Sequence, residues 1–274
     1  RAYFFAKKFF MNRNKMGVLI LTPFFSPNIG GVESHLDNLV SILDEKGYSV
    51  FVQTYSPITT KNTPWKKNEL IGSNVTINRY RWFGKYLFHK LENYPVLDFL
   101  YLTPYLFIRS FYFMITNAPK IDIIHAQGLN AGIIGIALKF IFRKRFIISL
   151  HAVYANINKN GFSGFATRLI LNNAAVVLGM SKAVINQFAQ YGIKKNLLNE
   201  YRYWVDTEHF KPMDLKEARK NLNIEDRFTV LFVGRLITIK GIKLLVEVAK
   251  ELKHLQFLFV GTGPLEDFLK STSK

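Results

Sequence analysis

Short apolar runs alternate with helical patterns along this chain, and this alternation restricts the fold more than any other feature. The run Val18-Leu19-Ile20-Leu21 is apolar at every position, whereas between 32 and 43 apolar residues recur at helical spacing. A continuous apolar run is typical of a strand buried on both faces, as in a parallel sheet covered by helices. The sequence therefore predicts an α/β protein with a Rossmann-like, doubly wound sheet.

The alternation continues to about residue 205 and outlines a first domain. Glycines at 30 and 31 open the first helix, and Gly47 suits its C-terminal end. A further helix is expected after Ala131, and the aromatic region from Trp82 to Thr116 is expected to be helical in part. The remaining strands are expected at 48–55, 75–80, 121–125, 145–150, 175–178 and 201–205, with a helix over 182–191.

A charged segment from Asp206 to Arg227 then interrupts the strand pattern and carries only a short helix, near 215–222. The pattern restarts with strands at 228–233 and 257–260 around a helix at 242–252. A doubly wound domain ordinarily has about five or six strands, so we expect the second domain to be incomplete. The predicted organisation is an extension over 1–15, a first domain over 16–208, a linker over 209–227 and a partial second domain over 228–274.

The net charge of +18 indicates a polyanionic partner. Basic residues are spread along the chain beside large apolar ones, as between Lys139 and Arg145, and no nucleic-acid motif is present. This pattern favours an anionic membrane surface over nucleic acid. The stretch 94–116 carries Asp98, Pro104 and Arg109, so we expect it to lie at an interface or in the core and not to span a bilayer.

The first fifteen residues are basic and aromatic but lack a small-residue cleavage site, so they do not resemble a secretory signal. They are expected to be either an amphipathic anchor or translated sequence upstream of a start at Met11 or Met16. The chain has no cysteine, which excludes disulfides and Cys-ligated metals and fits a cytoplasmic protein. No zinc-ligand spacing, nucleophile elbow or Walker motif is present, so we expect neither a metal nor a cofactor.

Three glycine turns follow predicted strands, at the sheet edge where open α/β folds bind ligands. The first is Gly30-Gly31, which opens a helix whose N–H groups favour an anion. In the second, Gly234-Arg235 is followed by Lys240, and the two cations suit a diphosphate. The third is Gly261-Thr262-Gly263. The alternative interpretations are tight turns without a ligand and solvated surface cations.

Two histidines, His125 and His151, also end predicted strands. A histidine in that position is able to face a substrate and to transfer a proton near neutral pH. The alternative is a histidine that is hydrogen-bonded inside the protein and has a structural role only.

Taken together, these motifs resemble the family 4 retaining glycosyltransferases, which have the GT-B fold of two facing Rossmann-like domains. The resemblance covers nearly the whole chain from about Met16. The matching segments are Leu21-Thr22-Pro23-Phe24-Phe25-Ser26-Pro27, Gly30-Gly31-Val32-Glu33, Asp122-Ile123-Ile124-His125, Val205-Asp206-Thr207-Glu208-His209-Phe210-Lys211-Pro212, Val233-Gly234-Arg235-Leu236 with Lys240-Gly241, and Val260-Gly261-Thr262-Gly263-Pro264.

The resemblance implies a role for each site residue. Arg235 and Lys240 would hold the donor diphosphate and stabilise the departing nucleotide, and His151 would contact the reacting sugar. The glycines at 30, 31, 261 and 263 would lie in donor-binding loops. Glu33 would lie beside the acceptor, and we place His125 there with it.

Two departures from the family pattern affect these expectations. Tyr203-Trp204 stands where the family usually has Asn-Gly before Val205-Asp206, so the loop there is expected to differ in shape. The paired glutamates that bind the donor sugar and ribose in the family lie beyond residue 274. The 274-residue chain alone is therefore expected to have little transferase activity.

The leading hypothesis is an enzyme that moves a hexose from a UDP- or GDP-sugar to a glycolipid or surface-polysaccharide acceptor. It would act with retention of configuration, at the cytoplasmic face of the membrane. Two alternatives stay open: a GT-B phosphorylase or epimerase, and a non-catalytic α/β module that binds anions or membranes.

Overall fold

The structure is a computed structural model that describes residues 15–60, 63–84, 87–91, 94–154 and 157–272. The predicted N-terminal extension lies, except for Lys15, outside the described residues. Contacts divide the chain into two units, of which the first ends at Tyr203 and the second begins at Trp204. The sequence pattern placed the end of the first domain at residue 208.

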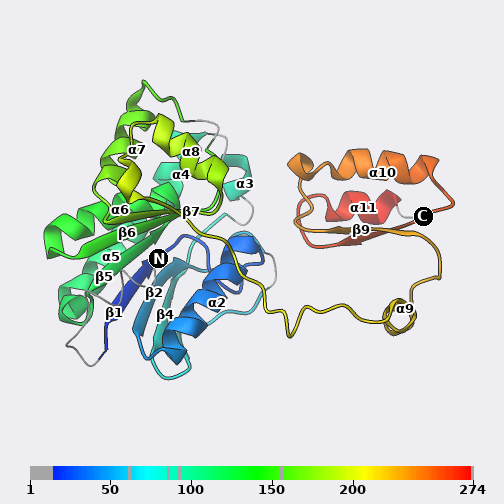
Figure 1. The fold of residues 1–274 in the computed structure, drawn as a ribbon, viewed down its shortest axis with the longest axis horizontal. Coiled ribbons are helices and arrows are strands. Elements are labelled where there is room, and N and C mark those ends of the chain that lie inside the picture. Colours follow the sequence, from blue (N-terminus) through cyan, green and yellow to red (C-terminus); the bar gives the residue numbers. More distant parts are fainter. Residues whose placement is uncertain (1–14, 61–62, 85–86, 92–93, 155–156, 273–274) are drawn as a thin grey trace. The chain divides into compact units, whose positions relative to one another are not determined.

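The first unit is built on one eight-stranded sheet with the order β3-β4-β2-β1-β5-β6-β7-β8 (Figure 1). All neighbouring strands are parallel except β3 and β4. The strands are β1 (Gly17–Leu21), β2 (Ser49–Tyr55), β3 (Asn68–Ile71), β4 (Val75–Tyr80), β5 (Ile123–Gln127), β6 (Arg145–Leu150), β7 (Val176–Gly179) and β8 (Leu198–Glu200). The predicted Rossmann-like sheet is confirmed.

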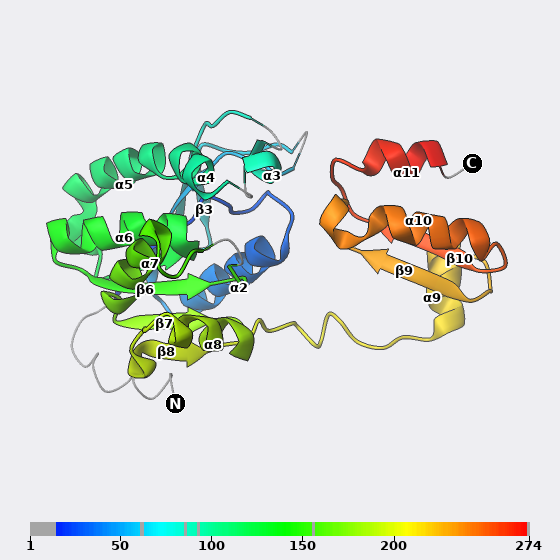
Figure 2. The same ribbon diagram turned by 90° about the horizontal axis from the view of Figure 1, so that it is seen from above.

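Helices cover both faces of this sheet. Helix α2 (Gly31–Glu45), which follows β1, packs Leu36 and Val40 against alternate residues of β1, β2 and β4. The opposite face carries α5 (Pro104–Asn117), α6 (Gly128–Phe142), α7 (Phe162–Asn172) and α8 (Lys182–Gln190), and Figure 2 shows α5 and α6 side by side above the sheet. The helices that follow β1 and β5 thus lie on opposite faces, which makes the boundary between these two strands a topological switch point.

The aromatic region forms three successive helices: α3 (Leu87–Leu91), α4 (Pro95–Leu102) and α5. Pro104 stands at the start of α5, where its missing N–H costs no helical hydrogen bond. Both α4 and α5 also present apolar side chains to solvent, namely Val96, Leu97, Leu100, Ile108, Tyr112 and Ile115, with Tyr94 just before α4. Among the described residues, no helix is both long enough and apolar enough to cross a bilayer.

One predicted strand is wrong. Residues 201–205 do not join the sheet, and the strand there is β8 (Leu198–Glu200). The reason is the short neighbour: β7 ends at Gly179, which pairs with Glu200, so no strand remains for Tyr201 and later residues to pair with. The sequence pattern also missed the edge strand β3, helix α7 and, in the second unit, helix α11 (Glu266–Thr272).

The second unit contains α9 (Leu215–Leu222), β9 (Thr229–Val233), α10 (Ile242–Glu251), β10 (Gln256–Val260) and α11 (Glu266–Thr272). The predicted short helix is confirmed as α9, where the Asp214 side chain accepts a hydrogen bond from the backbone N–H of Glu217. Strands β9 and β10 pair in parallel, with Val233 opposite Val260. Ile242 and Val246 of α10 are buried.

Candidate functional site

The loop after β1 leads into α2 at the switch point, and its two glycines have different surroundings. A Cβ atom on Gly30 would lie 2.3 Å from Oε2 of Glu33, because the buried Glu33 side chain turns back under the loop. A Cβ on Gly31 would meet nothing within 4 Å. An anionic ligand binds favourably at the first turn of a helix, provided that there is open space for it. The space at Gly31 is therefore compatible with its predicted place beside a ligand, whereas Gly30 has a structural explanation.

The two predicted histidines lie on neighbouring strands at the same edge of the sheet. His125 is buried on β5, and its Nε2 atom lies 2.8 Å from the hydroxyl of Ser149 on β6. His151 directly follows β6, and its Nε2 atom lies 2.8 Å from Oε1 of Gln127, the last residue of β5. His151 is thus at the carboxyl edge of the sheet. His125 lies deeper, because it pairs with Ile147, two residue pairs before the last pair of β5 and β6.

Two tyrosines complete the surroundings of His151. The hydroxyls of Tyr203 and Tyr201 lie 2.6 and 3.1 Å from its Nδ1 atom. An amide oxygen only accepts hydrogen bonds, so Nε2 of His151 carries a proton and donates a hydrogen bond to Oε1 of Gln127. Its Nδ1 atom then accepts a hydrogen bond from a tyrosine hydroxyl. His151 is therefore held as the neutral Nε2-protonated tautomer.

Burial keeps all three clustered histidines uncharged. Burial, together with the neighbouring His35 and His125, lowers the pKa of His151 to about 3. Burial likewise lowers the pKa of His125 to about 3 and that of His35 to about 4. It also raises the pKa of Tyr201 to about 12. At neutral pH this network offers neutral hydrogen bonds, and proton transfer by His151 is disfavoured.

The sequence interpretation missed His35 and Gln127. His35 lies on the second turn of α2 with its ring centroid 6.2 Å from that of His151. Gln127 presents a buried Nε2 amide that has no hydrogen-bond partner in the described part of the chain. A buried donor in that state is costly unless something else accepts its hydrogen bond. The available signal was position: both residues occupy the carboxyl edge at the β1–β5 switch point.

In the second unit, glycines allow the loops after β9 and β10 to pass close to each other. A Cβ on Gly261 would lie 1.8 Å from the carbonyl oxygen of Gly234, and one on Gly263 would lie 2.5 Å from that of Leu236. These glycines are therefore required by backbone crowding. Their contact with a donor stays a prediction.

Arg235 and Lys240 flank the same loop. Arg235 is half-buried directly after β9 and Gly234, and Lys240 is exposed at the end of a single 3-10 turn, two residues before α10 begins. Neither side chain forms an ion pair with any carboxylate that the structure describes. The loop thus offers two unneutralised cations near a helix N-terminus. Their contact with the donor diphosphate stays a prediction.

Within the described ranges, no group of three His, Cys, Asp or Glu side chains is arranged to hold a metal ion. The candidate residues of the first unit are neutral hydrogen-bonding rings, and those of the second unit are two cations without an ion pair to the described carboxylates.

Known proteins resemble the chain in both sequence and structure. The model of the family Glycosyltransferase Family 4 matches residues 29–208, and that of Glycosyl transferases group 1 matches residues 214–274. An uncharacterized glycosyltransferase of Methanocaldococcus jannaschii is 27% identical over 90% of this chain and 63% of its own length. The phosphatidylinositol N-acetylglucosaminyltransferase GPI3 subunit of Saccharomyces cerevisiae is 22% identical over 90% of this chain and 53% of its own length.

The crystal structure of Anabaena HepE in complex with UDP and glucose superposes with a TM-score of 0.62 at 19% identity, over 94% of this chain and 65% of that one. This likeness establishes the GT-B fold. The chain spans 63% and 53% of the lengths of the two curated relatives. Because the model of Glycosyltransferase Family 4 matches residues 29–208, well over half of the sequence, the chain belongs to that family.

Proposed function

We propose that this protein transfers a hexose from a nucleotide-diphosphate sugar to a lipid-linked or cell-surface polysaccharide acceptor, with retention of anomeric configuration. The observation that carries the proposal is the neutral network of His151, Gln127 and Tyr203 at the switch point of a Family 4 chain. Such a network suits a sugar, which presents uncharged hydroxyls that both donate and accept hydrogen bonds.

Sugar recognition would involve His151 and Gln127 together. The unpartnered Nε2 amide of Gln127 would donate to a sugar hydroxyl, while its Oε1 atom keeps the His151 ring in place. Because the pKa of His151 is lowered to about 3, its contribution at neutral pH is hydrogen bonding and orientation. Glu33, buried below the Gly30 loop, is proposed to lie on the acceptor side.

Departure of the nucleotide would depend on charge. As the bond between the sugar and the diphosphate breaks, negative charge develops on the leaving phosphate, and Arg235 with Lys240 would stabilise it. In this proposal the two cations supply the stabilisation that a metal ion provides in other enzymes, and neither a metal nor a cofactor takes part. UDP is the first donor nucleotide to test, because HepE is described with UDP and glucose.

A lipid acceptor at a membrane surface, which we propose to be the cytoplasmic face, is supported by three observations. The name of the yeast relative includes phosphatidylinositol, a lipid. In this chain, α4 and α5 expose large apolar side chains, and the net charge of +18 favours an anionic surface. We propose peripheral binding, through apolar contact and electrostatic attraction together.

The test is a transfer assay with radiolabelled UDP- and GDP-sugars and membrane lipid extracts, using this chain and a longer natural chain that contains it. We expect free nucleoside diphosphate and a glycosylated lipid or polysaccharide, with the anomeric configuration of the donor. Sugar phosphate as product would indicate a phosphorylase, and a new nucleotide sugar an epimerase. Binding of nucleotide by the longer chain without any product would indicate a non-catalytic module. Each of these three outcomes contradicts the proposal.

We further propose that the 274 residues alone turn over little, since the curated relatives are substantially longer than this chain. Comparable turnover numbers for this chain and the longer one would refute this part of the proposal.

A further inference from the structure

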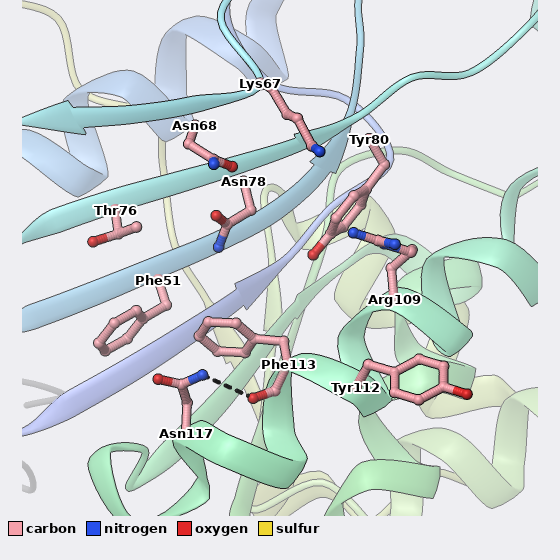
Figure 3. A pocket seen from close by; sticks show the side chains of 10 residues that line it. All are labelled: Phe51, Lys67, Asn68, Thr76, Asn78, Tyr80, Arg109, Tyr112, Phe113 and Asn117. Atoms are coloured by element: carbon pink, nitrogen blue, oxygen red, sulfur yellow. Dashed lines mark hydrogen bonds between the residues drawn. The ribbon is translucent and has the colours of Figure 1, made fainter.

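A pocket of about 460 Å³ lies on the first unit away from the histidines, between the open face of β4 and helix α5 (Figure 3). Asn68, Asn78 and Tyr80 line it from β3 and β4, and Arg109 and Tyr112 line it from α5. In the strand order β3-β4-β2-β1-β5-β6, β2 and β1 separate β4 from the strands that carry His125 and His151. The pocket is therefore distinct from the candidate sugar site.

The pocket forms because, among the described residues, α5 covers β2 but leaves the middle of β4 partly exposed. Val75 and Ile77 of β4 face α2 and are buried, so Thr76 and Asn78 point to the opposite face. On that face α5 packs over β2, where the rings of Phe51 and Phe113 lie 5.6 Å apart. Beside it, Thr76 and Asn78 of β4 stay partly exposed, whereas Tyr80 at the end of β4 is buried. The result is a polar floor with an apolar wall.

The charged side chains that line the pocket are both cationic. Arg109 lies with its guanidinium carbon 4.5 Å from the ring centroid of Tyr80, and Lys67 extends over the pocket from the segment before β3 (Figure 3). No acidic residue is among the lining residues. Within the described residues neither cation forms an ion pair. The nearby Glu69 instead pairs with Arg79.

The rim of the pocket continues into an exposed apolar strip. Tyr112 lines the pocket and is 65% exposed, and Ile108 and Ile115 on the same side of α5 are 47% and 54% exposed. Cationic and amide groups beside an exposed apolar surface match a molecule that has a phosphate at one end and hydrocarbon at the other.

We infer that this pocket binds the phosphate headgroup of an anionic membrane lipid, with the lipid chains lying along the exposed side of α5. Lys67 and Arg109 pair with the phosphate, and Asn78 and Asn68 offer amide donors to it. The lipid bound here is not the reacting acceptor, and it holds the first unit on the membrane in a fixed orientation.

The test is sedimentation of the 274-residue chain with phosphatidylcholine vesicles that do or do not contain phosphatidylinositol. Asn78→Asp places a negative charge in the pocket without changing side-chain size, and Asn38→Asp makes the same charge change on the exposed surface of α2. Lys67→Ala removes a pocket cation, and Lys66→Ala removes an exposed neighbour outside it. Thermal unfolding of each variant checks that it is folded.

We expect Asn78→Asp and Lys67→Ala each to weaken binding to the phosphatidylinositol vesicles about fivefold or more, in line with about 1 kcal/mol per charge near the membrane. The control substitutions are expected to have a clearly smaller effect. Equal losses for pocket and control variants would indicate general surface attraction and overturn the inference.

A second arm titrates glycerol phosphate by NMR. Affinity for this soluble ester as high as for the vesicles would overturn the assignment to a lipid. The measurements involve no sugar transfer, so failure of the proposed transferase function leaves their outcome interpretable.

Discussion

His35 and Tyr203 stack face to face, with ring centroids 4.3 Å apart and ring planes inclined by 6°. His35 belongs to α2, whereas Tyr203 is the last residue of the first unit. The hydroxyl of the same tyrosine also lies 2.6 Å from Nδ1 of His151. The segment that leaves the first unit is thus anchored in the candidate site by one ring and one hydroxyl. This anchor stands where the family usually has Asn-Gly.

Tyr203→Phe separates the two contributions of this residue. Phenylalanine keeps the stack on His35 but loses the hydroxyl that donates to His151. We expect the free energy of unfolding of the first unit to fall by about 1 kcal/mol for Phe, as for one buried hydrogen bond, and by about 2–3 kcal/mol for Ala, which also loses the ring. Urea denaturation measures both, with exposed Tyr112→Phe as the control. A Phe variant as unstable as the Ala variant would contradict the role assigned to the stack.

The stability of the first unit is expected to fall as the pH is lowered from about 6.5 towards 4. Burial lowers the pKa of His35 to about 4 and that of His125 and His151 to about 3. In that pH range the unfolded chain binds protons that the folded chain does not, so acid favours unfolding, by up to about 1.4 kcal/mol per pH unit for each histidine. Asp37 acts in the opposite direction, because burial raises its pKa to about 6, so acid favours its folded form. The three histidines are expected to outweigh this single carboxyl group.

Urea denaturation at pH 7 and pH 5 checks this dependence. The His35→Gln variant is expected to lose less stability between the two pH values than the wild type, since one titrating group is gone. An unchanged or higher stability at pH 5 would show that the histidines are charged, or solvated, in the folded protein.

His151 and Gln127 are expected to act together in sugar transfer. His151→Ala removes the ring, and Gln127→Ala removes both the amide that orients it and the buried Nε2 donor. In the longer chain each substitution is expected to lower kcat about a hundredfold, the usual effect of losing one placed hydrogen-bond donor. Because the residues act as one unit, the double variant is expected to lose far less than the product of the two single losses. The control is His254→Ala, an exposed histidine of the second unit.

Much of the first unit could be predicted from the sequence because its central strands are apolar on both faces. The runs that became β1, β5 and β6 admit few other structures, and they place His151 at a strand end without further information. By contrast, β8 is only three residues long and its position depends on where β7 ends, which no local pattern reports. The edge strand β3 is largely exposed, so it lacks a strong apolar signal.

The composition of the site was less predictable than its position. His35 occupies a helix turn, and Gln127 is one polar residue at the end of an apolar strand, so neither carries a local pattern. The stack of His35 on Tyr203 joins residues from α2 and from the segment after β8, and the path of that segment depends on the whole sheet. Sequence patterns recover what neighbours along the chain determine. They do not recover contacts between distant segments.

Alanine substitutions at two glycines separate effects on stability from effects on sugar transfer. Gly261→Ala would place a Cβ atom 1.8 Å from a backbone carbonyl, so we expect the second unit to lose about 2 kcal/mol or more of stability. Gly31→Ala meets open space at a helix start, so its effect on unfolding is expected to be within about 0.5 kcal/mol. Gly31→Ala is nevertheless expected to reduce transfer, because the methyl group occupies space proposed for substrate. A Gly31→Ala variant with unchanged stability and full activity would remove this glycine from the site.

Arg235 and Lys240 are expected to account for most of the affinity for nucleoside diphosphate. Each charge-assisted hydrogen bond to a phosphate is worth about 1.5–3 kcal/mol, so Arg235→Ala or Lys240→Ala is expected to weaken UDP binding about tenfold or more in calorimetry. Lys250→Ala removes an equal charge from the opposite end of α10 and is the matched control.

In the longer chain, Arg235→Ala and Lys240→Ala are each expected to lower transfer by more than they weaken UDP binding. The reason is that the leaving phosphate carries more negative charge in the transition state than in the bound donor. Losses in transfer that only equal those in binding would assign the pair to donor capture alone. Losses in UDP binding no larger than that of Lys250→Ala would exclude both residues from the diphosphate site.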